Sequence, residues 1–263
     1  MAKAVLYWMG MHGLRQFHLP VRLLLTIGAC VSLLSGCDQP PATSQPSSSA
    51  MPQTGFGQRL GTDVTTQPGR SSAAVQPELS RIVAFGNSLT AGLGVAQGES
   101  YPSQLAQRLA KEGFRYRVIN AGVSGETTAG GLRRVSWILQ SRPQIVILEL
   151  GANDGLRGLR VEETQANLER IIEQLTQANV AVVLAGMKMP PNYGADYTTR
   201  FEAIYPALAK KYRIPLIPFF LDKVAGVSSL NQADGIHPTA DGYRLIVGTV
   251  LEALVPLLDK GSS

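Results

Sequence analysis

The feature that most constrains the fold is an alternation of two apolar patterns from Ser80 to the C-terminus. Short β-branched runs, apolar on both faces, alternate with segments of helical periodicity, and such runs are typical of strands covered on both sides. The alternation predicts an α/β fold, a three-layer α/β/α sandwich around one parallel sheet with right-handed crossovers. The five predicted strands are residues 81–85, 115–119, 144–150, 180–185 and 214–217.

Two of the segments between and after these strands carry a clear helical stripe. From Val161 to Leu175 apolar side chains recur every three or four residues, and two glutamates lie in the first turn, where the helix dipole favours acids. A second stripe runs from Tyr243 to Leu258. Ligands of open α/β sheets bind at the carboxyl ends of the strands, so the residues that follow the strands are the candidates for function.

Ser88 follows the first predicted strand and lies in the segment Gly86-Asn87-Ser88-Leu89-Thr90. On a turn into a helix its hydroxyl is exposed, and the free N–H groups of the helix start can stabilise a developing negative charge. Serine is also a common helix N-cap. Ser88 alone therefore does not distinguish a nucleophile from a cap.

A glycine and an asparagine follow the second and third predicted strands. Gly122 lies in residues 120–128 and has no Cβ, so its N–H can approach a substrate oxygen closely. Asn153 lies in residues 151–155 and carries an amide donor that can point to the same place. Both residue types are also common in ordinary turns, and that alternative stays open for each.

The segment Asp234-Gly235-Ile236-His237-Pro238 contains an acid and an imidazole three residues apart. This spacing lets one loop present both groups, so that Asp234 accepts the N–H of His237 and fixes its tautomer. Thr239 can cap the helix that follows. The simpler alternative is a surface histidine beside a turn aspartate.

These four segments together resemble the SGNH, or GDSL, hydrolase family, whose sequence blocks supply Ser, Gly, Asn and His in this order. The resemblance covers residues 80–258 and is closest to the arylesterase, thioesterase I and lysophospholipase L1 branch. It implies a flavodoxin-like fold. The implied roles are Ser88 as nucleophile, His237 as general base, Asp234 as its orienting acid, and Ser88, Gly122 and Asn153 as the oxyanion hole.

The resemblance implies a serine esterase that hydrolyses carboxylic esters or thioesters through a Ser-Asp-His triad and an acyl-enzyme, without a cofactor. The expected partner is a small ester, thioester or lysophospholipid. Two alternatives stay open: an O-deacetylase of envelope carbohydrates with the same site, and a non-catalytic binding lipoprotein. An α/β-hydrolase is disfavoured because Thr90 stands where the G-x-S-x-G elbow needs its second glycine.

Three further features lie near the predicted site. Asn87 stands where the family usually has Asp, and we expect altered stability or rate from it, because that Asp is not one of the reacting groups. Glu149, an acid at the end of an apolar strand, is interpreted as a paired structural residue. The Met and Tyr side chains of residues 187–197 either line an acyl groove or pack their own loop.

Residues 1–36 have the pattern of an export signal. They contain three basic residues and no acid, and their apolar stretch of residues 23–34 is too short to span a bilayer. Leu34-Ser35-Gly36-Cys37 resembles the lipobox of bacterial lipoproteins, which implies lipidation at Cys37. An ordinary signal peptide with an incidental cysteine is the alternative.

A lipidated Cys37 predicts an exported protein of the bacterial cell envelope that faces the periplasm and is anchored to a membrane by lipid. Asp38 resembles the signal that keeps some lipoproteins on the inner membrane. Residues 37–79 are rich in Gln, Pro, Ser, Thr and Gly and predict a flexible tether. The hydrolase domain is then residues 80–259, followed by a tail of residues 260–263.

Removal of the signal also changes the charge. The whole chain of 263 residues has 24 Lys and Arg against 19 Asp and Glu, a formal charge of +5. Without the three bases of residues 1–36, 21 bases face 19 acids, so a charge of +2 remains and no nucleic-acid partner is expected. His237 is then the one remaining imidazole, and neither a metal cluster nor a disulfide is expected.

Overall fold

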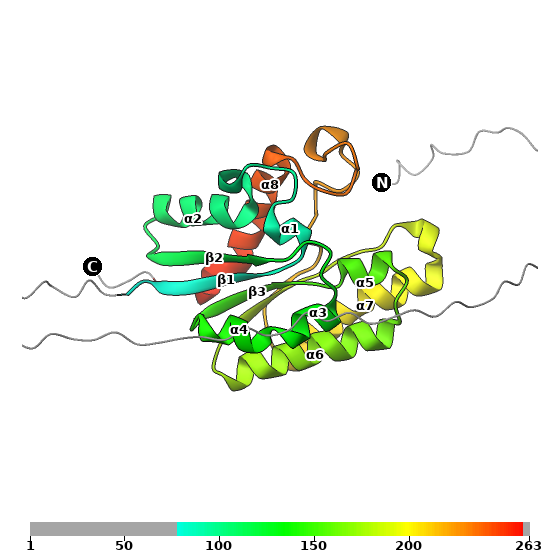
Figure 1. The fold of residues 1–263 in the computed structure, drawn as a ribbon, viewed down its shortest axis with the longest axis horizontal. Helices are drawn as coiled ribbons and strands as arrows, with labels where there is room; N and C mark the ends of the chain where they lie inside the picture. Colours follow the sequence, from blue (N-terminus) through cyan, green and yellow to red (C-terminus); the bar gives the residue numbers. More distant parts are fainter. Residues whose placement is uncertain (1–77, 260–263) are drawn as a thin grey trace, which may run out of the picture. The chain divides into compact units, whose positions relative to one another are not determined.

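The five predicted apolar runs form the strands of one parallel sheet in the computed structural model, which describes residues 78–259 (Figure 1). The strand order is β2-β1-β3-β4-β5, which is the flavodoxin-like order and confirms the predicted α/β sandwich. The strands are β1 (Ser80–Gly86), β2 (Tyr116–Gly122), β3 (Ile145–Glu149), β4 (Ala181–Ala185) and β5 (Leu216–Ile217).

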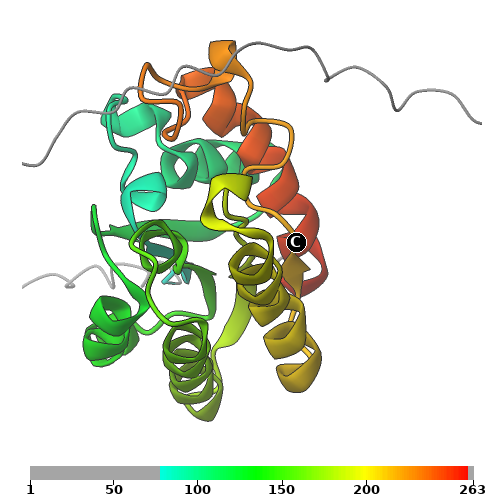
Figure 2. The same ribbon diagram turned by 90° about the vertical axis from the view of Figure 1, so that its right-hand side faces the viewer.

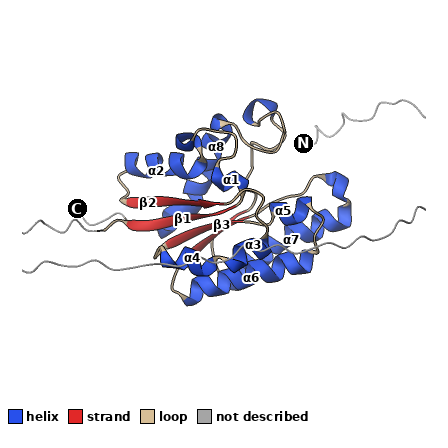
Figure 3. Cartoon of the chain, viewed as in Figure 1, coloured by secondary structure: helices blue, strands red, loops and turns tan. Residues whose placement is uncertain are grey.

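Helices cover both faces of this sheet (Figures 1 and 3). In Figure 1, α2 and α8 lie on one face and α3, α4, α6 and α7 on the other, and the rotated view in Figure 2 shows the same layers. The α-helices are α1 (Ser88–Ala91), α2 (Tyr101–Lys111), α3 (Thr128–Arg133), α4 (Val135–Gln140), α5 (Ala152–Leu156), α6 (Val161–Gln177), α7 (Ala195–Tyr212) and α8 (Ala240–Leu254). The 3₁₀ helices are η1 (Gln97–Glu99), η2 (Pro191–Tyr193), η3 (Ser228–Leu230) and η4 (Val255–Leu257).

The two predicted helical stripes form buried faces of α6 and α8. In α6 the stripe is buried from Val161 to Leu175, as expected. In α8 the predicted helical stripe to Leu258 is too long. The α-helix ends at Leu254, and the 3₁₀ turn η4 follows it. Pro256 lies in that turn; proline has no N–H to donate and its ring clashes with the carbonyl four residues earlier.

The edge strands differ from their predicted bounds. β2 extends through Gly122, where residues 115–119 were predicted, because Asn120, Ala121 and Gly122 pair with the last residues of β1. Gly122 is therefore the last residue of a strand and does not lie in the loop after it. β5 is shorter than predicted, and Pro215 and Pro218, which cannot donate to the ladder, flank it on both sides.

The predicted signal peptide, Cys37 and most of the tether lie outside the described residues, as does the tail of residues 260–263. Within residues 78–259, none of the helices is both long enough and apolar enough to cross a bilayer.

Candidate active site

The turn from β1 into α1 presents Ser88 at the carboxyl edge of the sheet. Asn87 is the N-cap of α1, and its side chain accepts a hydrogen bond from the Leu89 N–H at 2.9 Å. The N-cap interpretation of Ser88 is therefore wrong, because its neighbour fills that position. The Ser88 hydroxyl instead lies 2.9 Å from Nε2 of His237.

His237 lies in a loop that its own hydrogen bonds hold in shape. Its Nδ1 is 2.6 Å from Oδ2 of Asp234, whose other oxygen accepts from the N–H groups of Ile236 at 2.9 Å and His237 at 3.0 Å. Thr239 caps α8 as expected, since its hydroxyl accepts from the Gly242 N–H. His237 is thus not an isolated surface histidine: it lies between Asp234 and Ser88.

The hydrogen bonds to Asp234 also set its charge. The backbone N–H and the ring of His237, with the Ile236 N–H, lower the pKa of Asp234 to about 2. An ionised Asp234 accepts the Nδ1 proton of His237, which leaves the Nε2 lone pair for the Ser88 hydroxyl. The three side chains therefore form one hydrogen-bonded chain with a defined direction for proton transfer.

Asn153 lies in α5, directly after β3. Its Nδ2 donates to the carbonyl of Glu126 at 3.0 Å. A side-chain amide has two N–H donors, so this bond fixes the plane of the amide and leaves the second N–H for another acceptor. Asn153 is therefore a positioned donor and not simply a turn residue.

Gly122 does not fit the oxyanion role that the sequence predicted for it. Its N–H already donates to Oδ1 of Asn120 at 2.9 Å. A Cβ at this position would lie 2.2 Å from the backbone N of Ala91. Glycine is therefore required here because β2 packs directly against α1.

Gly125 lies three residues further along the same segment. Its φ of +77° suits glycine, and among residues 78–259 its N–H has no acceptor. Arg157 donates to its carbonyl at 2.9 Å, and Asn153 donates to the carbonyl of the next residue, Glu126. The sequence did show a second glycine in residues 120–128. With a strand predicted to end at residue 119, both glycines were expected in the loop, and nothing in the sequence favoured Gly125 over Gly122.

A buried ion pair that the sequence did not predict braces the same corner. Arg134 pairs with Glu126, and their side chains are 17% and 7% exposed. Arg134 also donates to the carbonyls of Ala121 at 2.8 Å and Gly86 at 3.3 Å, and it lies over the Phe85 ring. One guanidinium therefore ties together the ends of β1 and β2 and the loop that contains Gly125.

Glu149 is a paired structural residue, as predicted. Its carboxyl is fully buried at the end of β3 and accepts hydrogen bonds from Asn87 and Thr90. Burial raises its pKa to about 8, although those hydrogen bonds oppose the shift. Asn87, the departure from the family pattern, is thus the partner of a buried acid.

An apolar cavity of about 290 Å³ lies next to the segments that contain Ser88, His237 and Asn153. Its lining includes the direct chain neighbours of the Ser, His and Asn above: Leu89, Ile236 and Ala152. The lining also includes Met187, Met189, Pro190, Phe219 and Leu221.

The Met and Tyr side chains of residues 187–197 lie in different surroundings. Met187 and Met189 line the apolar cavity. Tyr193 and Tyr197 instead pack the loop, because their hydroxyls donate to the carbonyls of Leu156 at 3.0 Å and Leu159 at 2.8 Å.

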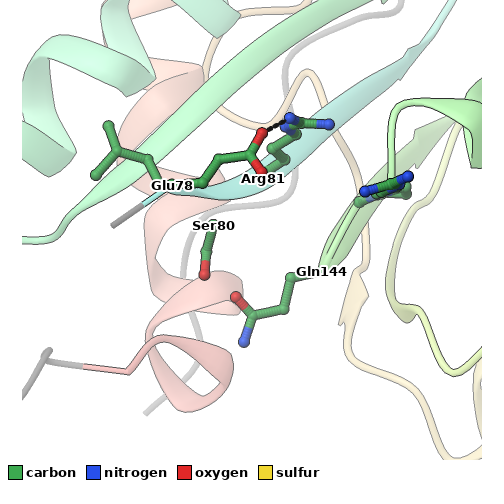
Figure 4. Close-up of a pocket in the computed structure, with 7 residues that line it drawn as sticks. Glu78, Ser80, Arg81 and Gln144 are labelled. Carbon is green, nitrogen blue, oxygen red and sulfur yellow. Dashed lines mark ion pairs between the residues drawn. The ribbon is translucent and has the colours of Figure 1, made fainter. Parts of the chain in front are cut away.

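A second hollow, of about 310 Å³, lies at the opposite, amino-terminal edge of the sheet (Figure 4). There Glu78 forms an ion pair with Arg81 beside Ser80 and Gln144. None of the residues predicted to act in catalysis lines it. Within residues 78–259, no cluster of three or more His, Cys, Asp or Glu side chains is arranged to hold a metal ion.

A Ser-His-Asp chain at the carboxyl edge of a parallel α/β sandwich is an arrangement found in hydrolases that transfer acyl groups. Comparison with known families agrees. Residues 84–245 match the model of the GDSL-like Lipase/Acylhydrolase family, and the chain belongs to this family of SGNH hydrolases.

Curated relatives carry the names of esterases and thioesterases. The chain is 40% identical over 184 residues to the esterase TesA of Pseudomonas aeruginosa, covering 70% of this chain and 92% of that relative. It is 36% identical over 182 residues to the thioesterase 1/protease 1/lysophospholipase L1 of Escherichia coli, covering 69% and 86%. The arylesterase of Vibrio mimicus is 38% identical over 185 residues, covering 70% and 92%.

Solved structures show the same fold. The crystal structure of TesA matches with a TM-score of 0.66 at 40% identity, covering 68% of this chain and all of that one. The crystal structure of AlinE4, an SGNH-hydrolase family esterase, matches with a TM-score of 0.59 at 46% identity, covering 70% and 99%.

Proposed function

We propose that this protein is a serine esterase that cleaves carboxylic esters or thioesters through an acyl-enzyme on Ser88. The observation that carries the proposal is the hydrogen-bonded chain from Ser88 through His237 to Asp234, located beside an apolar cavity. Relatives named esterase, arylesterase and thioesterase support the reaction class.

In the proposed reaction, Nε2 of His237 takes the proton of the Ser88 hydroxyl while Oγ forms a bond to the acyl carbon. The electron pair of the carbonyl moves to its oxygen. When the tetrahedral intermediate collapses, the bond to the leaving alkoxide or thiolate breaks, and His237 returns the proton to that group. Water then repeats the sequence on the acyl-enzyme and releases the acid.

The developing oxyanion is held by three donors in this proposal: the Ser88 N–H, the Gly125 N–H and the second N–H of Asn153. Gly125 replaces Gly122 because Asn120 occupies the Gly122 N–H. Loss of the Asn153 amide is expected to reduce kcat by about 10² to 10³. Gly122→Ala should instead impair folding, because its Cβ would overlap Ala91.

The apolar cavity supports an acyl chain as the part of the substrate that is recognised. Leu89 and Ile236, the chain neighbours of Ser88 and His237, line it, and Met187 and Met189 can adapt to a flexible chain. An O-deacetylase would leave most of this cavity empty. We therefore propose acyl esters or thioesters longer than acetyl, with lysophospholipids as an amphiphilic example.

The test is a series of p-nitrophenyl esters from acetyl to dodecanoyl, with wild type and Ser88→Ala. We expect kcat/KM to rise beyond acetyl, and kcat of Ser88→Ala to fall by about 10⁶, since serine and histidine act as one unit. Strict preference for acetyl would favour the deacetylase alternative. Equal rates for Ser88→Ala and wild type would refute the proposal.

We also propose export and lipid anchorage through Cys37, on the evidence of the signal pattern and lipobox in the sequence. Metabolic labelling with a radioactive fatty acid should mark wild type in the membrane fraction, whereas Cys37→Ser should be unlabelled and released from it. Equal labelling of both would contradict lipidation at Cys37.

A further inference from the structure

A buried polar cluster lies beneath Ser88 and takes no part in the proposed proton transfer. Its members Asn87, Thr90 and Glu149 are at most 1% exposed. Glu149 is the last residue of β3 and lies opposite Gly86 in the register with β1. The cluster therefore connects the central strands to the first turn of α1, which begins with Ser88.

Asn87 uses both ends of its amide in this cluster. Its Oδ1 accepts from the Leu89 N–H at 2.9 Å and caps α1, so Nδ2 faces Glu149 and donates to Oε1 at 2.7 Å. The other oxygen of Glu149 accepts from the Thr90 hydroxyl at 2.7 Å and the Asn87 N–H at 3.3 Å. The residues on both sides of Ser88 are thus held by one carboxyl.

The backbone at Gly86 is adapted to this contact. A Cβ there would lie 2.1 Å from the Thr90 hydroxyl oxygen and 2.5 Å from Oε2 of Glu149. Any side chain at position 86 would therefore displace the carboxyl from Thr90. Glycine at this position lets the acid lie directly against the turn that carries the nucleophile.

We propose that Asn87 and Glu149 are a positioning pair that keeps Ser88 in its reactive geometry whether or not Glu149 is ionised. The Asn87 amide donates to either form of the carboxyl, and the Thr90 hydroxyl can rotate from donor to acceptor. An acid at position 87 would fill the same place only while the two carboxyls share a proton. The proposal rests on the proposed role of Ser88 as nucleophile.

Glu149 is the acid of this cluster that titrates near neutral pH. The groups that face it from other elements are the hydroxyls of Tyr101 in α2, Tyr205 in α7 and Tyr243 in α8. Burial raises the pKa of each of these tyrosines above its ordinary value, so they stay neutral where Glu149, with a pKa of about 8, ionises.

The test compares Asn87→Asp with the exchanged pair Asn87→Asp/Glu149→Gln. In the single variant, the new carboxylate at position 87 can still accept from the Leu89 N–H, but the donor toward Glu149 is lost. In the double variant, the new amide at position 149 donates to the new acid at position 87, and its oxygen accepts from Thr90 and the backbone N–H of position 87. Every hydrogen bond of the wild-type cluster is then restored, while only the bond between the two side chains has its donor and acceptor exchanged, and the pair again carries one acid.

The measurement is kcat/KM of a p-nitrophenyl ester from pH 6 to 9.5, divided by the wild-type value at each pH. For Asn87→Asp we expect this ratio to fall by about tenfold or more toward alkaline pH, as the shared proton is lost. For the double variant we expect a ratio that does not change with pH. A merely structural role would lower the ratio by the same factor at every pH.

A constant ratio for Asn87→Asp would overturn the proposal, as would an alkaline loss that persists in the double variant. Thermal unfolding of the same proteins over the same pH range provides a readout that needs no activity: Asn87→Asp should lose Tm relative to wild type as pH rises. If wild type lacks activity that depends on Ser88, the proposed function fails, while the Tm series still tests the pair.

Discussion

Two carboxyls, Asp234 and Glu149, belong to the hydrogen-bonded surroundings of Ser88, and each accepts three hydrogen bonds. Asp234 accepts from the Ile236 N–H, the His237 N–H and the His237 ring, and its pKa is lowered to about 2. Glu149 accepts from the Asn87 N–H, the Asn87 amide and the Thr90 hydroxyl, yet its pKa is raised to about 8. The same number of donors thus gives opposite charge states near neutral pH.

Solvent explains this difference. The side chain of Asp234 is 45% exposed, so water stabilises its charge in addition to the three donors. Glu149 is fully buried, and the free-energy cost of removing its charge from water exceeds the stabilisation of the carboxylate by its three hydrogen-bond donors. The exposed acid is therefore suited to stabilise a protonated histidine, and the buried acid is suited to hold backbone in place.

The largest effect is expected from replacing each acid in turn with its isosteric amide. Asp234→Asn should lower kcat by about 10⁴, because the amide favours the wrong histidine tautomer and cannot stabilise the imidazolium. Glu149→Gln should cost about tenfold or less, since Gln keeps an acceptor for Asn87 and a donor for Thr90. The measurement is steady-state hydrolysis of a p-nitrophenyl ester at pH 7.5. Equal losses in the two variants would remove the distinction between the acids.

A second prediction concerns a buried acid that has a cationic partner. Arg134→Met leaves Glu126 buried without its partner and frees the carbonyls of Ala121 and Gly86. We expect a loss of about 3–5 kcal/mol in the free energy of unfolding, measured by urea titration.

The matched control for Arg134→Met is Arg200→Met, which breaks an ion pair with the exposed Glu162. No measurable change in the urea midpoint is expected there, because surface pairs contribute little. A similar loss in both variants would show that burial does not decide the strength of these pairs.

A third prediction concerns the pH dependence of stability. The pKa of Glu149 is raised from 4.5 to about 8, so folding favours its protonated form. Its contribution is fully present below about pH 4.5 and is lost as pH rises toward 8. The free energy of unfolding of wild type minus that of Glu149→Gln should therefore decline across this range and then level off. A difference that grows with pH would contradict the burial argument.

Asp234 should show the opposite sign. Its pKa is lowered from 3.8 to about 2, so its contribution is present above pH 3.8 and is lost as pH falls through 2. The free energy of unfolding of wild type minus that of Asp234→Asn should therefore fall as pH drops from about 3.8 to about 2. A difference that stays constant or grows over that range would contradict a lowered pKa of Asp234.

Local patterns in the sequence predicted the sheet, the α6 and α8 faces, and the Asp234-His237 contact, because each depends on periodicity or on a spacing of three residues. The Gly122 N–H donates to Asn120 within β2, and the sequence did not indicate this because the end of β2 depends on pairing with β1. The Arg134–Glu126 pair and the partners of Glu149 join distant segments of the chain. Contacts between distant segments leave no local pattern in the sequence, so the three-dimensional structure was needed to identify these partners.

The most direct test of the account is covalent labelling with a fluorophosphonate, followed by intact mass measurement and peptide mapping. The account predicts one adduct per folded chain, located on Ser88, no adduct in Ser88→Ala, and much slower labelling of Asp234→Asn. A folded wild-type protein that stays unlabelled, or an adduct on a different serine, would contradict it.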